Sequence, residues 1–132
     1  MRYLTLLLLL CAFAGCGDPS RPQTVACEGT LLMNGQPLQV AQREIGVGQV
    51  AIEFIPAEPA GPAPQTYGAQ ADAAGKFSLP GGIPPGKYKI AVHQWDPYPN
   101  VDKLQGAFSK EKTPLVREID GKSPIDIELN QK

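Results

Sequence analysis

The chain has 132 residues and a net charge of −1, with 12 Lys and Arg against 13 Asp and Glu. No basic patch stands out, so the composition gives no support for nucleic-acid binding. The chain has 14 Gly, 14 Pro and a single His. This composition favours strands joined by turns and excludes a metal site built from several His.

The first 15 residues have the form of a secretory signal peptide. Arg2 precedes an apolar run, YLTLLLLLCAFAG, that ends in small residues. A membrane-spanning helix is the alternative, but the run is shorter than the ~20 residues that a bilayer core requires. Residues 1–15 are therefore predicted to be a removable signal, and the remaining chain has the size of one domain.

The end of the apolar run, together with the next residue, resembles a lipid-attachment motif. Phe13-Ala14-Gly15-Cys16 resembles a bacterial lipobox, although an aliphatic residue is usual at the position of Phe13. The resemblance implies that Cys16 is acylated, with chains such as palmitate, and anchors the protein to a membrane of the cell envelope, facing the periplasm or the exterior. Ordinary cleavage that leaves Cys16 as a free thiol is the alternative. Residues 16–25 are polar and are expected to form a flexible tether.

The folded domain is predicted to span residues 26–132 and to begin with a strand at residues 26–33. Cys27 on that strand has no disulfide partner in the chain, because Cys11 falls in the signal and Cys16 is the lipidation site. We expect Cys27 to be a small buried apolar residue, with a reactive or intermolecular thiol as the alternative.

Strand and turn signals alternate through the first half of the domain. The alternation in QVAIEFI is the clearest early strand pattern, because its apolar residues recur at every second position. In chain order, the expected elements are a turn at Asn34-Gly35, an exposed excursion at residues 39–48, a strand at residues 49–55, a Pro-rich surface loop at residues 56–64 and a strand at residues 65–71.

The stretch DAAGKFSLPGGIPPGKYKIAV, residues 72–92, contains the strongest turn chemistry. Its first four residues predict a turn, because Asp accepts hydrogen bonds from nearby amides and Gly adopts positive φ. A strand is expected at residues 76–79, and the Pro and Gly of residues 80–86 predict a loop. Residues 87–93 alternate as a half-buried strand whose Tyr88 is expected to anchor the core.

A long loop is predicted at residues 94–112, since Pro residues flank Tyr98. Trp95, Tyr98 and Phe108 in this loop are the candidate binding residues, because stiff aromatic side chains suit protein contacts or stacking on sugar rings. The alternative is that one or two of these rings fold back and cap the end of the domain. The chain is then expected to finish with a strand at residues 113–119, a turn at Asp120-Gly121 and a strand at residues 125–129.

These elements predict an all-β domain: a single antiparallel β-sandwich of about seven strands. The Asp-x-x-Gly turn at residues 72–75 and the Pro-Gly-x-Tyr element at residues 85–88 resemble those of carboxypeptidase regulatory-like or transthyretin-like domains. The particular resemblance is to small envelope lipoproteins of the planctomycete type, and it covers residues 26–129. It implies a transthyretin-like sandwich, although residues 39–48 are longer than the usual connection.

Candidate catalytic residues are few. His93 could act as a base for Cys27 only if the fold brought the two together, and a His at the end of an edge strand is the simpler interpretation. Hydroxyisourate hydrolases of the transthyretin fold end in Tyr-Arg-Gly-Ser, whereas this chain ends in Leu-Asn-Gln-Lys. Asp72 and the acids near the C-terminus lack the dense spacing of a calcium loop. No catalytic residue, metal site or cofactor is therefore assigned.

The sequence predicts a lipid-anchored envelope protein whose non-catalytic sandwich binds or scaffolds other molecules. Its expected partners are the membrane, through Cys16, and envelope proteins or glycans. A carbohydrate- or peptidoglycan-binding module is one alternative, and a hydrolase on a transthyretin-like fold is the other.

Overall fold

The computed structural model describes residues 23–58 and 65–130. This part of the chain contains eight strands and one short 3-10 helix, joined by turns and loops. The predicted signal peptide, the predicted lipidation site Cys16 and most of the predicted Pro-rich loop lie outside these residues. In chain order the elements are β1 (Val25–Met33), β2 (Gln36–Pro37), η1 (Arg43–Ile45), β3 (Gln49–Pro56), β4 (Tyr67–Ala71), β5 (Lys76–Ile83), β6 (Gly86–Trp95), β7 (Val116–Ile119) and β8 (Ile125–Leu129).

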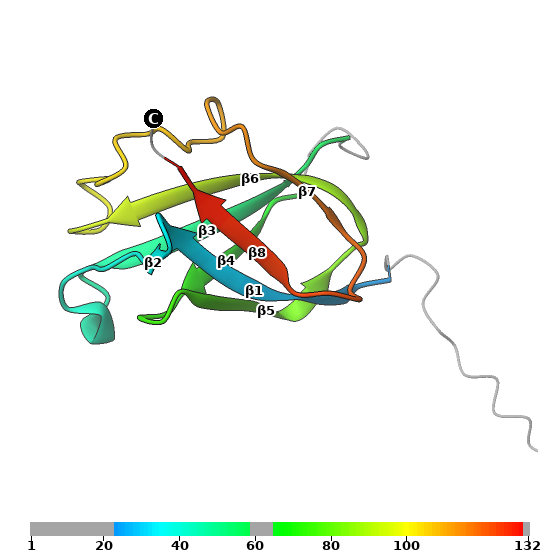
Figure 1. Cartoon of the computed structure of the whole chain (residues 1–132), viewed down its shortest axis with the longest axis horizontal. Coiled ribbons are helices and arrows are strands. Elements are labelled where there is room, and N and C mark those ends of the chain that lie inside the picture. The colour runs from blue at the N-terminus through cyan, green and yellow to red at the C-terminus, as the bar shows by residue number, and fades with distance from the viewer. Residues whose placement is uncertain (1–22, 59–64, 131–132) are drawn as a thin grey trace, which may run out of the picture.

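The strands form two sheets that pack as a β-sandwich, which confirms the predicted fold class (Figure 1). Sheet A contains β2, β1 and β5, with β8 also paired to β1, and sheet B has the order β4-β3-β6-β7. Within residues 23–58 and 65–130, no helix is long and apolar enough to cross a membrane.

One strand pair departs from the expected antiparallel arrangement. The chain passes from β7 in sheet B to β8 in sheet A, and β8 then runs parallel to β1. Gly29 permits this pairing, because a Cβ at that position would lie 1.8 Å from the carbonyl oxygen of Ile125. The pairing of β8 with β1 therefore depends on a residue without a side chain.

The core follows the period-2 pattern of the strands. Val50, Ile52 and Phe54 alternate inward from β3 and are fully buried, as the sequence predicted. Tyr88 is also buried, and its hydroxyl donates to the carbonyl of Pro84 at 2.6 Å. The remaining fully buried large side chains come from both sheets and from the loop after β6: Leu31, Ile83, Ile90, Val92, Leu104, Ile119, Ile127 and Leu129.

The turn at residues 72–75 forms as predicted. Asp72 Oδ1 accepts hydrogen bonds from the amides of Ala74 and Lys76, both at 2.9 Å. Gly75 has a φ of 82° and donates to the Asp72 carbonyl at 3.0 Å. The strands that it joins, β4 and β5, belong to different sheets, so the turn is a corner of the sandwich.

The prediction of a loop at residues 80–86 is wrong for residues 80–83, which belong to β5. Strand β5 continues to Ile83, which pairs with Val25, and the register shifts between Val25 and Cys27. Three β5 residues, Pro80 to Gly82, thus oppose a single β1 residue as an irregular bulge. Pro is tolerated there because β5 is an edge strand, and Gly82 adopts a φ of 67°.

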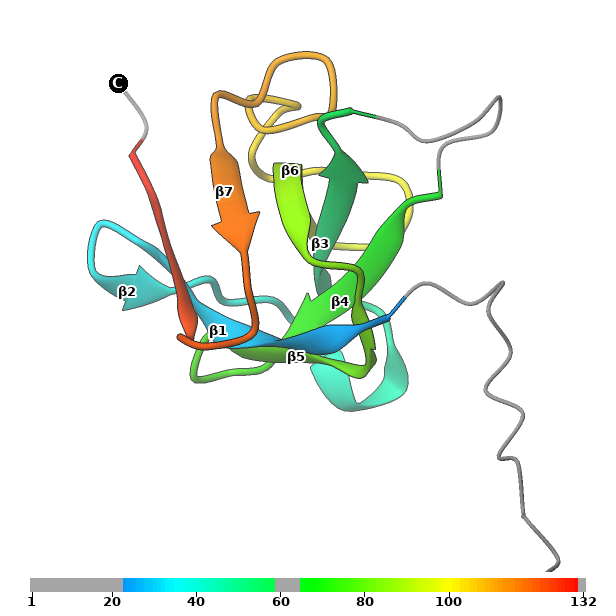
Figure 2. The same ribbon diagram turned by 90° about the vertical axis from the view of Figure 1, so that its right-hand side faces the viewer.

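The two long sides of the sandwich differ. On one side β4 and β5 are joined directly by the corner at Asp72. On the other side β7 and β8 end their respective sheets, and no pairing connects them in the described residues (Figure 2). Because β4 and β5 lie in contact whereas β7 and β8 have no comparable contact, the side with β4 and β5 is called closed and the side with β7 and β8 is called open.

Candidate functional site

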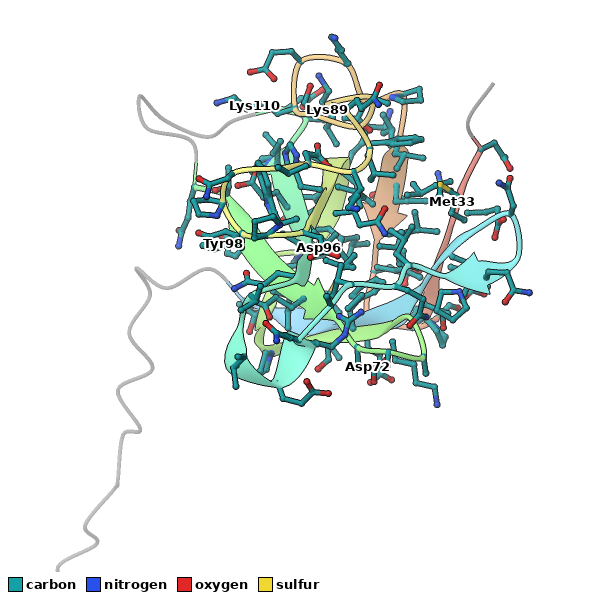
Figure 3. All side chains as sticks on the ribbon, turned by 90° about the vertical axis from the view of Figure 1, so that its left-hand side faces the viewer. Met33, Asp72, Lys89, Asp96, Tyr98 and Lys110 are labelled. Atoms are coloured by element: carbon teal, nitrogen blue, oxygen red, sulfur yellow. The ribbon has the colours of Figure 1, made fainter. Side chains whose placement is uncertain are left out.

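Two loops gather at the end of the sandwich where β6 ends and β3 begins. The first loop is residues 39–48, and the second is residues 96–106; together they are called the loop end. The register pairs Gln49 with Trp95, which places the start of β3 beside the end of β6. Figure 3 looks at this end and labels Asp96 and Tyr98 on it.

Hydrogen bonds join the two loops to each other. The amide of Tyr98 donates to the carbonyl of Val47 at 2.6 Å, and the amide of Ala41 donates to Asp96 Oδ2 at 3.1 Å. Residues 39–48, which the sequence predicted only as an exposed excursion, therefore form a surface loop that hydrogen bonds fix to the second loop.

The side chain of Arg43 fixes the first loop to the sandwich. Its guanidinium donates to the carbonyl of Ala71 on β4 and to the carbonyl of Leu38, the latter at 3.1 Å. Leu38 itself is buried in the core. The loop is thus attached to the sandwich at both its start and its helical turn.

Three rings line up beside the second loop. His93 and Trp95 project from the outer face of β6, because the alternate residue Val92 points into the core. Their rings stack with centroids 5.0 Å apart and an interplanar angle of 18°. Tyr98 approaches Trp95 edge-on, at 6.1 Å and 86°. The indole of Trp95 therefore has aromatic neighbours on both the strand and the loop.

Asp102 is the acceptor around which the second loop folds. Its Oδ1 accepts from the amides of Gln94 and Leu104, both at 3.0 Å. Its Oδ2 lies 2.9 Å from Nδ1 of His93 and accepts from the amide of Gly106 at 3.1 Å. Burial alone would raise the pKa of this carboxyl group, but these hydrogen bonds outweigh burial and hold the pKa below its ordinary value.

The ionised carboxylate of Asp102 determines which ring nitrogen of His93 carries the proton and how the imidazole is oriented. A carboxylate only accepts hydrogen bonds, so Nδ1 of His93 carries the proton that it donates to Asp102. The imidazole is therefore oriented by Asp102 and stacked on Trp95. Sequence reasoning missed Asp102, although the Asp-Lys-Leu-Gln-Gly run has the form of a turn that begins with an Asp acceptor.

The interpretation of His93 as a residue of an edge strand is wrong. Strand β6 lies between β3 and β7, and beside His93 the loop continues the sheet through the bridge between Trp95 and Asp102. Cys27 lies in the core, where burial raises the pKa of its thiol to about 11. Because His93 projects from the outer face of sheet B, the fold does not bring it to Cys27.

The predicted binding residues fall into two environments. Phe108 is buried in the core, and its carbonyl accepts from the amide of Val92 at 2.9 Å. Its ring thus fits the alternative in which an aromatic residue folds back and caps the sandwich. Trp95 is half-buried, whereas Tyr98 is 49% exposed. Of the three, Tyr98 presents the most exposed ring.

The loop end also exposes aliphatic side chains that sequence reasoning missed. Ile45, in η1, is 74% exposed, and Val101 is 46% exposed. Ile45 stands directly before Gly46, which ends η1 with a positive φ, and no residue of η1 is buried. Together with Tyr98, these residues make the loop end the main place where large apolar side chains are exposed in the described part of the chain.

Comparisons with protein-family models, with curated proteins and with solved structures gave no match. The structure shows a small all-β domain of two sheets, and the comparisons identify no family for it.

A second feature is an open groove of about 530 Å³ that runs over sheet A and the corner at Asp72. Its lining is mostly polar: Glu28, Gly29, Thr30, Gln70, Asp72, Lys76, Phe77, Ser78 and Pro124. Among the residues that the structure describes, no three His, Cys, Asp or Glu side chains gather in a way that could hold a metal ion.

Proposed function

We propose that this chain is a lipid-anchored protein of the cell envelope whose sandwich binds another envelope protein through the loop end. The observation that carries the proposal is the exposure of Ile45, Tyr98 and Val101 on loops that hydrogen bonds hold in place. Exposed apolar side chains on a well-ordered surface are typical of protein contacts. Their burial contributes favourable free energy, and the loops lose little conformational entropy because hydrogen bonds already order them.

The direction of the chain supports this arrangement. Val25 at the start of β1 pairs with Ile83, close to where β6 begins, and β6 ends at the loop end. Figure 1 accordingly shows the described chain starting at the opposite end of the sandwich from these loops. An anchor at Cys16 would attach near the start of β1, so the loop end would face away from the membrane.

The family proposal rests on the two fold-defining corners. The Asp-x-x-Gly turn at residues 72–75 links the two sheets, and the Pro-Gly-x-Tyr element at residues 85–88 places the buried Tyr88. Both support a carboxypeptidase regulatory-like, transthyretin-like domain of the planctomycete lipoprotein type.

Chemical crosslinking of the tagged full-length protein in its native envelope tests the contact surface. Replacing Val101 and Tyr98 by Ser should remove the captured partner, because both side chains would lose apolar area buried on binding. Val116→Ser is a matched control, since Val116 is 45% exposed but lies on β7. Capture of the same partners by all variants would contradict the proposed surface.

The anchor needs its own experiment. Cys16→Ser should move the protein from the detergent phase to the aqueous phase and change its processed mass, because acylation requires the thiol. Unchanged partitioning and mass would show that Cys16 is not acylated.

Carbohydrate binding is the second candidate, and the groove on sheet A supports it. Carboxylate, hydroxyl and amide groups line this groove and suit the hydroxyls of a sugar. Binding of the protein to peptidoglycan, compared with its Gln70→Ala and Lys76→Ala variants, tests this candidate. The variants should bind less, and equal binding would exclude the groove.

A further inference from the structure

The backbone of β8 offers unpaired hydrogen-bonding groups. In the described part of the chain β1 is the only strand that pairs with β8, and the pairing is parallel. The Ile125 carbonyl lies against Gly29, and the Leu129 carbonyl accepts from the amide of Asn34 at 3.4 Å. Because backbone groups alternate sides along a strand, the amides and carbonyls of Asp126 and Glu128 point away from β1.

The free edge of β8 lies on the open long side of the sandwich. Strand β7, the neighbouring element on that side, belongs to sheet B (Figure 2). Natural edge strands are protected by Pro, bulges or charged side chains, and β8, with a regular register and the sequence Ile-Asp-Ile-Glu-Leu, has only its two acids as protection. The backbone of β8 is therefore a template for a strand whose own charges offset these acids.

The charges on β8 select the kind of strand that fits. Asp126 and Glu128 are exposed on the outer face of sheet A, and Glu28 on the neighbouring β1 is exposed on the same face. Glu128 also accepts from the amide of Gly35, in the turn between β1 and β2, at 2.8 Å, whereas no hydrogen bond of the Asp126 side chain is found among the described residues. A strand added at this edge would gain from Lys or Arg at alternate positions.

Pairing of β8 with a second copy of itself is disfavoured by the same charges. An antiparallel pair centred on Ile127 would set Asp126 directly opposite Glu128 of the copy, and like charges in that position are destabilising. The acidic strand thus opposes self-association while leaving the edge open to a basic partner.

We propose that the free edge of β8 binds an extended basic segment of another protein, which adds to sheet A as a further strand. The recognition combines backbone hydrogen bonds to Asp126 and Glu128 with cross-strand pairing of their carboxylates to Lys or Arg. This surface differs from the loop end, so the two proposals stand or fall separately.

A short peptide that alternates Val and Lys is the probe, and the full-length protein is the target. Binding is followed by fluorescence anisotropy of the labelled peptide and by amide hydrogen exchange of the protein. We expect saturable binding that slows exchange at Asp126 and Glu128, because their amides become hydrogen-bonded. Changing both acids to Lys should weaken binding about tenfold, while Glu118→Lys on β7 should leave it unchanged.

Two further peptides separate strand addition from simple charge attraction. A Val/Lys peptide with every backbone amide N-methylated keeps its charge but has no amide donor on either edge, so it should not bind. A Val/Glu peptide should not bind either. The proposal would be overturned if either control peptide bound as well as the probe. It would also be overturned if the peptide slowed amide exchange only outside β8, or if the protein formed a dimer paired through β8.

Discussion

Asp102→Asn is the sharpest test of how the loop end is held. The change keeps the shape of the side chain but replaces one of its two oxygens by an NH2 group. Each oxygen of Asp102 accepts two hydrogen bonds, so two of its donors, from the set His93, Gln94, Leu104 and Gly106, would face another donor. The Asp102 side chain is only 11% exposed, so water cannot readily replace the lost bonds.

The size of the effect follows from these lost bonds. Hydrogen bonds to charged groups contribute about 1.5–3 kcal/mol each, and their contributions are not additive, so we expect Asp102→Asn to cost about 2–5 kcal/mol of unfolding free energy. Urea denaturation at neutral pH measures this as a lower midpoint with an unchanged slope. Asp126→Asn is the control, because Asp126 is exposed and makes no side-chain hydrogen bond among the described residues.

The pH dependence gives a second, independent criterion. Since the pKa of Asp102 is lowered in the folded state, its stabilisation is fully present above the unfolded pKa of about 4 and is lost as the pH falls through the folded pKa. The difference between wild type and Asp102→Asn should therefore shrink below pH ~4. Equal midpoints at neutral pH, or a difference that persists unchanged in acid, would refute the role given to Asp102.

Three further predictions concern the scaffold. Gly29→Ala should release β8 from β1 and lower the thermal unfolding midpoint, because a Cβ there meets the Ile125 carbonyl oxygen at 1.8 Å. The control Gly68→Ala, whose Cβ has nothing within 4 Å, should be neutral or stabilising by about 0.4–1 kcal/mol in the same assay. Thr113→Val should cost about 1–3 kcal/mol in urea denaturation, because the buried Thr113 hydroxyl donates to a β6 carbonyl at 2.6 Å. Cys27 should react with a thiol reagent only as fast as the protein unfolds, and rapid labelling of the native protein at pH 8 would contradict its burial.

Local patterns in the sequence were sufficient to predict most strands and the sandwich. The alternation around Phe54 and Tyr88 places both rings in the core, where they pack edge-on at 6.4 Å. The Asp72 turn was predictable because its hydrogen bonds join residues only two to four positions apart. These features share one property, which is that they depend on neighbours in the chain.

The features that sequence reasoning missed depend on distant residues. The parallel pairing of β8 requires Gly29 to receive Ile125, and nothing local to either residue indicates that contact. Strand β5 passes through Pro80 because the partner that accommodates the bulge lies on β1. The position of Asp102 beside His93 likewise depends on the path of the loop that joins β6 to β7.

Two charged side chains hold the loop end in place, and their engagement fixes the surface that a partner would meet. The Asp102 carboxylate is engaged by His93 and three amides, and the Arg43 guanidinium is engaged by two carbonyls. Ile45, Tyr98 and Val101 are exposed on the same loops, among exposed polar side chains such as Glu44 and Lys103. A partner that binds there would gain from burying these apolar side chains and would meet loops whose backbone is already held by hydrogen bonds. Such a surface favours docking without rearrangement of this protein, so the hydrogen-exchange rates of its β3 and β6 amides should stay unchanged when the crosslinked partner is bound.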